Sequence, residues 1–127
     1  LRLLPISPSS TMPDPRSHCP IATTLDLIGD RWTLLVVRDM LFFDKHRFEE
    51  FLDSPEGIST NILASRLKSL EQLGFVTKRP YSNHSRRMHY QLSEDGYSLR
   101  PVLEAIARWG LQHIPETRIP EPFQPSD

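Results

Sequence analysis

The sequence predicts a mainly helical α+β domain that contains one small β-hairpin, and two observations predict it. Apolar residues recur at helical spacing through most of residues 18–114. Residues 86–92 instead alternate apolar and polar side chains, as a half-buried strand does. The chain has 127 residues, of which 38% are hydrophobic and 24% charged, so it fits one globular domain that can bury a core.

The first three helices are predicted from apolar spacing. Residues 21–28 place apolar side chains at positions i, i+4 and i+7, and Gly29-Asp30 then breaks the helix. The run RWTLLVVRDML from Arg31 is apolar nearly all round, which is typical of a centrally buried helix. A short third helix is expected over residues 48–52.

The fourth helix has well-defined ends. Ser59 is a good N-cap, and Gly74 followed by Phe75 has the pattern of a Schellman C-terminus, with Phe75 against Leu70. One face carries a buried stripe formed by Leu63, Leu67 and Leu70. The opposite face is polar and contains no acid, and its members are Asn61, Ser65, Lys68 and Gln72.

The hairpin and the closing helix follow. Residues 75–79 and 86–92 are the predicted strands, joined by a polar turn. Ser93 caps a last helix, which Pro101 should kink or restart. This helix has two apolar stripes, one formed by Leu99, Leu103 and Ile106 and the other by Val102, Ala105 and Trp109. One small core needs a single stripe, so we expect the second to face another subunit.

This order of elements is the plan of a winged helix-turn-helix. The third and fourth helices form the helix-turn-helix, and residues 80–85 form the tip of the wing. Residues 18–114 are the predicted folded domain, between a proline-rich arm (1–17) and a proline-rich tail (115–127). Because the chain starts with Leu1, either residues precede it in the natural protein or residues 1–11 are foreign and Met12 is the natural start.

Charge is unevenly distributed along the chain. The net charge is −1, but residues 59–92 hold six Lys and Arg against Glu71 alone, a net of +5 that leaves −6 for the remainder. A basic block of this kind favours a polyanion partner over an evenly mixed surface. We therefore expect double-stranded DNA as the partner.

The fourth helix is the expected recognition helix. Thr60, Asn61 and Ser65 are placed to meet base edges, while Lys68 lies farther along and should reach phosphate. Arg66 flanks the buried stripe and fits either an internal ion pair or a phosphate contact. The DNA-binding residues predicted on this helix are Ser59, Thr60, Asn61, Ser65, Arg66 and Lys68.

The wing supplies further cations. Lys78 and Arg79 end the first strand, and Arg86 and Arg87 begin the second, where they can track phosphates or probe the minor groove. Arg47 opens the third helix and is a weaker phosphate candidate, the alternative being a surface ion pair with an acid such as Glu50.

Four segments together carry a family resemblance: CPIATTLDLIGDRWTLLVVRDML, RFEEF, ISTNILASRLKSLEQLGFV and RRMHYQLSEDGYSLRPVLEAIARWG. In order and spacing, the chain from Cys19 to Gly110 resembles the HxlR-type transcriptional regulators. The resemblance implies a cytoplasmic, homodimeric, DNA-binding repressor or activator that dimerises through its terminal helices. The wing sequence 82–87 and the proline-rich arms depart from the common pattern. The expected dimer contacts are Ile21, Leu25, Val102, Ala105 and Trp109.

Cys19 is the only cysteine, which excludes an intramolecular disulfide and a cysteine zinc site. Some HxlR-type proteins sense oxidants or electrophiles through a cysteine at this position, and a helix N-terminus favours the reactive thiolate. Cys19 is therefore a candidate redox sensor, and the alternative is a small residue that only packs. The five histidines show no metal-ligand spacing, so no metal site is expected.

No catalytic motif or cofactor-binding loop is present, so we expect neither an enzyme nor a cofactor. No apolar run approaches the ~20 residues that span a bilayer, so no membrane partner is expected. Two other functions stay open: a protein-interaction winged helix, and a small-molecule binding protein or effector site. The aromatic residues considered for such a pocket are Trp32, Phe42, Phe43, Phe48 and Trp109, which at helical spacing also fit the core.

Overall fold

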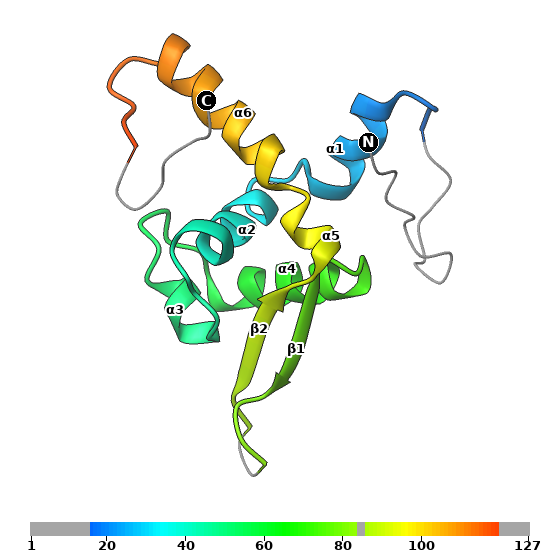
Figure 1. Cartoon of the computed structure of the whole chain (residues 1–127), viewed down its shortest axis with the longest axis vertical. Coiled ribbons are helices and arrows are strands. Elements are labelled where there is room, and N and C mark those ends of the chain that lie inside the picture. Colours follow the sequence, from blue (N-terminus) through cyan, green and yellow to red (C-terminus); the bar gives the residue numbers. More distant parts are fainter. Residues whose placement is uncertain (1–15, 84–85, 120–127) are drawn as a thin grey trace.

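The structure, a computed structural model, describes residues 16–83 and 86–119, and it confirms a mainly helical fold with one β-hairpin. Most of the proline-rich arm and tail lies outside the described residues. The elements, in chain order, are α1 (Pro20–Ile28), α2 (Thr33–Phe42), α3 (Phe48–Leu52), α4 (Thr60–Gln72), β1 (Val76–Pro80), β2 (Met88–Leu92), α5 (Glu94–Tyr97) and α6 (Arg100–His113) (Figure 1).

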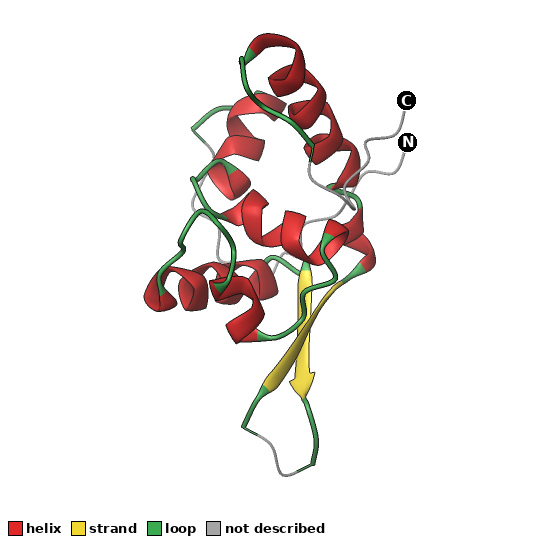
Figure 2. Ribbon diagram, turned by 90° about the vertical axis from the view of Figure 1, so that its left-hand side faces the viewer, coloured by secondary structure: helices red, strands yellow, loops and turns green. Residues whose placement is uncertain are grey.

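Helix α2 is the centre of the domain. It contacts α4, β2 and α6, and its Val37 is completely buried. Helices α1 and α6 lie at one end of the molecule, and the hairpin extends from the other (Figures 1 and 2). The largest fully buried side chains are Phe51, Leu63, Leu70, Val37 and Val76. In the described part of the chain, no helix is long and apolar enough to cross a membrane.

The break between α1 and α2 is stabilised by Asp30. Its carboxylate accepts hydrogen bonds from the backbone N–H groups of Trp32 (3.0 Å) and Thr33 (3.1 Å), and from the Thr33 hydroxyl. These bonds satisfy N–H groups that have no partner inside the first turn of α2. The predicted break at Gly29-Asp30 therefore also supplies the side chain that stabilises the start of α2.

Both predicted ends of α4 are confirmed. The Ser59 hydroxyl accepts a hydrogen bond from the Ile62 N–H at 3.2 Å. At the other end the Phe75 N–H donates to the Leu70 carbonyl (2.9 Å) and the Gly74 N–H to the Glu71 carbonyl (3.0 Å), which is the Schellman pair. Gly74 has φ +83°, a left-handed conformation that glycine adopts without a steric penalty.

The hairpin is confirmed with shifted strand limits. Strand β1 pairs with β2 from Val76↔Leu92 to Pro80↔Met88, so Arg86 and Arg87 precede β2 instead of lying within it. A hydrogen bond from the Tyr81 N–H to the Arg87 carbonyl (2.8 Å) continues the pairing toward the loop. The tip, residues 84–85, lies outside the described residues.

The closing helix is divided into two, as Pro101 predicts. The Ser93 hydroxyl caps α5 by accepting the Gly96 N–H at 3.1 Å, and the chain restarts as α6 with Pro101 in its first turn. Leu99 and Leu103 are buried as expected, but Ile106 is 53% exposed. The expectation for Ile106 is wrong because the C-terminal half of α6 extends beyond the packed core.

Candidate nucleic-acid interface

The polar face of α4 is presented to solvent. Leu63, Leu67 and Leu70 are buried against the rest of the domain, which orients the opposite face outward. Three exposed members of this face, Asn61, Ser65 and Lys68, are predicted DNA contacts, and a fourth, Thr60, is exposed in the first turn beside it. Ser59 is also exposed; its hydroxyl accepts the capping bond and keeps its proton and one lone pair for a further contact.

The hairpin brings a second set of cations to the same end of the molecule. It projects past α4, away from α1 and α6 (Figures 1 and 2). Lys78, Arg79, Arg86 and Arg87 are all exposed on it. Lys78 lies 3.7 Å from Glu71 of α4, an ion pair that ties the strand to the helix. The structure therefore places the wing cations and the polar face of α4 at one end of the fold.

Arg47 joins the helix-turn-helix to the wing. Its guanidinium stacks over the Tyr81 ring at 4.2 Å and donates a hydrogen bond to the Tyr81 hydroxyl. Arg47 does not form the side-chain ion pair with Glu50 that the sequence left open. Glu50 Oε1 instead accepts the backbone N–H groups of His46 (2.9 Å) and Arg47 (2.8 Å), and these bonds, that of His46 first, hold the pKa of Glu50 below its usual range.

Residues 46–47 also extend the hairpin as a short third segment. Arg47 forms a bridge with His89, and the Tyr90 N–H donates to the His46 carbonyl at 2.7 Å. The His46 and His89 rings stack with centroids 4.7 Å apart, and His89 is half-buried. Burial, together with the nearby His46, Arg79 and Arg47, lowers the pKa of His89.

Arg66 takes the ion-pair alternative. Its guanidinium lies 3.4 Å from Asp30 Oδ1, so it links α4 to the start of α2. Burial raises the pKa of Asp30, but the hydrogen bonds from Thr33 and Trp32 and the charge of Arg66 outweigh it, and the net pKa is lowered. Arg66 thus helps to orient α4 relative to α2.

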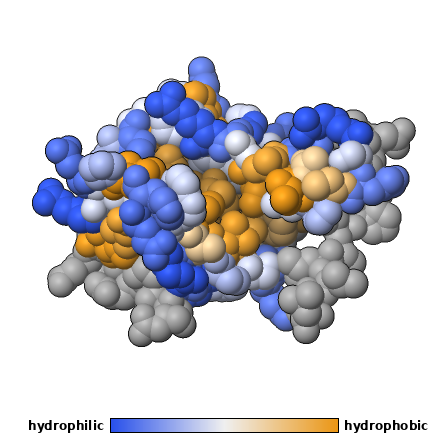
Figure 3. All heavy atoms as spheres, turned by 90° about the horizontal axis from the view of Figure 1, so that it is seen from above, coloured by the Kyte–Doolittle hydropathy of each residue, from blue (hydrophilic) through white to orange (hydrophobic). Residues whose placement is uncertain are grey.

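The terminal helices expose the apolar residues predicted for a dimer contact. Ile21 and Leu25 of α1 are 70% and 55% exposed, and Trp109 of α6 is 59% exposed. Val102 and Ala105 are exposed beside Trp109, and Ile106 adds to the same surface. Figure 3, which views the molecule from the end that carries α1 and α6, shows apolar side chains gathered across it. A patch of this kind marks an interaction surface.

Cys19 and the aromatic residues occupy separate places. Cys19 is exposed at the N-cap of α1, and its backbone N–H donates to the Ser17 hydroxyl at 3.2 Å. Of the aromatic residues considered for one pocket, Trp32, Phe42 and Phe48 pack against the core, Phe43 lines a pocket, and Trp109 stacks on His113. They do not form a single aromatic cavity.

The sequence reasoning missed a buried ionic cluster on α2. The Asp39 side chain is only 4% exposed and pairs with Arg38 (2.9 Å) and Lys45 (3.6 Å), while the Ser54 hydroxyl donates to it. The acid inside the apolar run RWTLLVVRDML could have indicated this cluster, because a buried carboxylate requires hydrogen-bond or ion-pair partners. The sequence could not identify those partners.

A helix-turn-helix followed by a basic antiparallel hairpin defines the winged helix class of nucleic-acid-binding domains. The family described as HxlR-like helix-turn-helix matches residues 27–118, and the chain belongs to this family.

Relatives and solved structures agree with this assignment. The chain is 36% identical over 100 residues to MT3179 of Mycobacterium tuberculosis (strain CDC 1551 / Oshkosh), named an uncharacterized HTH-type transcriptional regulator. That match covers 79% of this chain but only 62% of the relative. The crystal structure of PA1607 superimposes with a TM-score of 0.72 at 35% identity, covering 88% of this chain and 82% of that one. The reduced form of the redox regulator HypR gives 0.66 at 30% identity, covering 74% and 92%.

Proposed function

We propose that this protein is a cytoplasmic transcriptional regulator that binds a pseudo-palindromic DNA site as a homodimer. The observation that carries the proposal is the distribution of charge on the fold: the basic block of residues 59–92 coincides with α4 and the wing. These are the two elements that a winged helix brings to a duplex.

The two elements have different roles. The N-terminal part of α4 enters the major groove, where Asn61 can pair with adenine through two hydrogen bonds. The wing cations contact phosphates, which sets register and affinity without selecting sequence. Because these contacts release counterions, binding weakens steeply as the salt concentration rises.

The exposed apolar residues of α1 and α6 form the dimer interface. A two-fold interface buries the same patch on both copies, so each exposed apolar side chain adds its buried area to the interface twice. Since this surface lies at the end opposite the hairpin (Figure 1), dimerisation leaves both recognition helices available. The two helices then enter successive major grooves roughly 34 Å apart.

The test is selection from a random duplex library at ~100 mM salt, with three variants compared. Asn61→Ala should relax the preference at one base position in each half-site, while Arg87→Ala should weaken binding to all sequences alike. Gln72→Ala, exposed at the far end of the same helix, is the matched control and should bind as the wild type does. Failure to enrich any palindrome would contradict the proposal and favour a protein-interaction domain.

We further propose that Cys19 tunes DNA binding by thiol oxidation. Its exposure at the start of α1, next to the helix that carries Ile21 and Leu25 of the proposed dimer interface, supports this, and so does the similarity of the chain to HypR, which is described as a redox regulator. A mild oxidant should change the affinity of the wild type for its selected site, reductant should reverse the change, and Cys19→Ser should not respond. An equal response in Cys19→Ser would exclude the role.

A further inference from the structure

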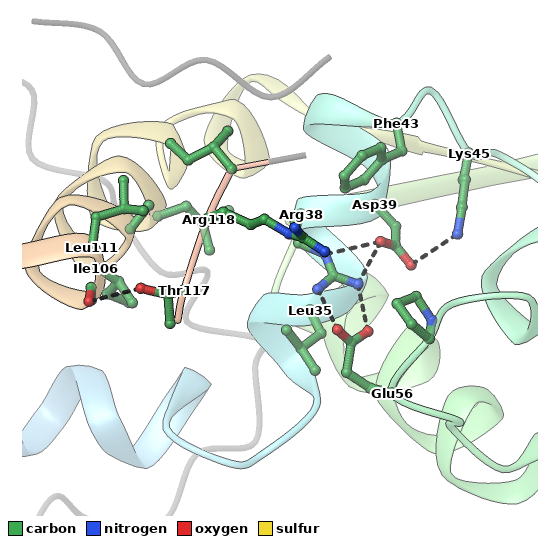
Figure 4. A pocket seen from close by; sticks show the side chains of 15 residues that line it. Leu35, Arg38, Asp39, Phe43, Lys45, Glu56, Ile106, Leu111, Thr117 and Arg118 are labelled. Atoms are coloured by element: carbon green, nitrogen blue, oxygen red, sulfur yellow. Dashed lines mark hydrogen bonds and ion pairs between the residues drawn. The ribbon is translucent and has the colours of Figure 1, made fainter. Parts of the chain in front are cut away.

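A pocket of about 630 Å³ lies between α6, α2, the turn after α3 and residues 117–119 (Figure 4). This volume is in the range of small-molecule sites. One wall is apolar, with Leu35 of α2 facing Leu103, Ile106 and Gly110 of α6. The pocket opens because the C-terminal half of α6 extends beyond the core.

The pocket also has charged lining residues, and cations are in excess among them. Arg38 and Lys45 lie on the α2 side with two acids, Asp39 and Glu56, and Arg118 lies on the side of residues 117–119, for a net charge of +1. Both acids are already engaged by cations. Arg38 binds Glu56 through two hydrogen bonds of 2.8 and 2.9 Å, while Asp39 is shared by Arg38 and Lys45.

Among the cations that line the pocket, Arg118 is the one whose guanidinium is not engaged by a carboxylate of the described residues. Its side chain reaches across the pocket toward Arg38 (Figure 4). Within residues 16–83 and 86–119, no carboxylate pairs with Arg118. Two guanidinium groups that face one apolar pocket match a ligand with an anionic head and an apolar body.

We propose that this pocket binds a small organic anion, and that its occupation regulates DNA binding. The head contacts Arg118 and the edge of Arg38, and the apolar body packs between Leu35 and α6. This inference rests on the proposed function only for its regulatory part, since binding of the anion requires no DNA.

The route from the pocket to α4 is short. Glu56, held by Arg38, lies three residues before Ser59, the cap of the recognition helix. Between them Gly57 adopts φ +74° and Ile58 is buried, so the turn has one well-defined path. An anion that competes with Glu56 for Arg38 shifts this turn and with it the start of α4. By linkage, DNA must in turn change the affinity for the anion.

The probe is anilinonaphthalene sulfonate, which joins an apolar body to one negative charge, and its uncharged parent phenylnaphthylamine is the matched ligand. Fluorescence titration of the full chain should show binding of the sulfonate. Arg118→Gln should weaken sulfonate binding about tenfold, equivalent to ~1.4 kcal/mol, and leave the uncharged parent unaffected. Equal binding of the sulfonate by this variant and the wild type would overturn the assignment of an anion site.

Gly110 supplies an independent, steric test. A Cβ built at Gly110 meets nothing within 4 Å, so Gly110→Leu fills the pocket without disturbing the helix backbone. It should abolish binding of both probes, while Gly110→Ala, the matched control, should retain it. Unchanged binding to Gly110→Leu would place the probe elsewhere, for example on the exposed face of α1 and α6, and would overturn the proposal.

Regulation is tested on the selected DNA site. Saturating sulfonate should change the DNA affinity of the wild type and leave that of Gly110→Leu unchanged; equal effects on both would overturn the regulatory part. The two proposals fail separately. If the probe binds with the expected variant pattern but no DNA site is selected, the transcriptional function is rejected and the anion site is supported. If a DNA site is selected but the probe does not bind, the anion site is rejected and the transcriptional function is supported.

Discussion

Gly96 is the position at which a single methyl group should be most damaging. It is buried at the start of the path from the hairpin to α6. A Cβ added there would lie far inside contact distance of the Phe75 carbonyl oxygen and 2.8 Å from Leu92 Cδ2. That carbonyl accepts the Ser93 N–H at 3.0 Å, so it cannot move away without loss of a hydrogen bond.

The cost of Gly96→Ala follows from these contacts. Ordinary contact begins at 3.4 Å, so Leu92 Cδ2 must retreat by about 0.6 Å, which a side chain can do. The backbone carbonyl cannot rotate aside, which puts the overpacking cost near the upper end of ~1–3 kcal/mol. A weakened hydrogen bond adds ~1 kcal/mol, and the better helix propensity of alanine returns about the same. We expect a net destabilisation of about 3 kcal/mol.

Urea unfolding measures this directly, and it is done at one fixed protomer concentration because the proposed dimerisation would add to stability. Gly110→Ala in α6 is the control, because it adds the same methyl group where there is open space around it. It should raise the free energy of unfolding by ~0.5–1 kcal/mol. The two variants should therefore move the midpoint in opposite directions. A Gly96→Ala midpoint at or above that of the wild type would refute the packing argument.

Three further outcomes are expected. Trp109→Glu should convert the dimer to monomer in sedimentation experiments without unfolding it, because Trp109 is 59% exposed in the single chain; a stable dimer would move the interface elsewhere. His89 has a folded-state pKa below 6.5, so the folded protein binds fewer protons and stability falls as the pH drops from 7 to 5. His89→Gln should flatten that dependence in urea titrations, and an unchanged slope would exclude His89 as its source. Asp30→Ala should lower stability by about 1 kcal/mol because the Trp32 and Thr33 N–H groups at the start of α2 lose their acceptor, and circular dichroism melting that matches the wild type would contradict this role of Asp30.

The sequence was sufficient for features that depend on neighbours along the chain. Ser59 and Gly74 marked both ends of α4 because capping bonds join residues a few positions apart. Pro101 marked the restart of the closing helix for a similar local reason. Alternation predicted the hairpin, although Arg86 and Arg87 fell outside β2 because pairing, not pattern, ends a strand.

The sequence was not sufficient for contacts between distant segments. Arg47 meets Tyr81, and His46 meets His89, only because α3 packs beside the wing. The pocket between α2 and α6 likewise is lined by residues that lie far apart in the sequence, from Leu35 to Ile119.

What the sequence determined by itself was the set of elements, their order, and the concentration of positive charge on two of them. Only the tertiary structure decided that Arg66 pairs with Asp30, that Asp39 has its partners, and that Ile106 lies outside the core. The physical reason is the range of the interactions. Helix caps and turns depend on backbone geometry within a few residues, whereas ion pairs and burial depend on where each helix ends in space relative to the others.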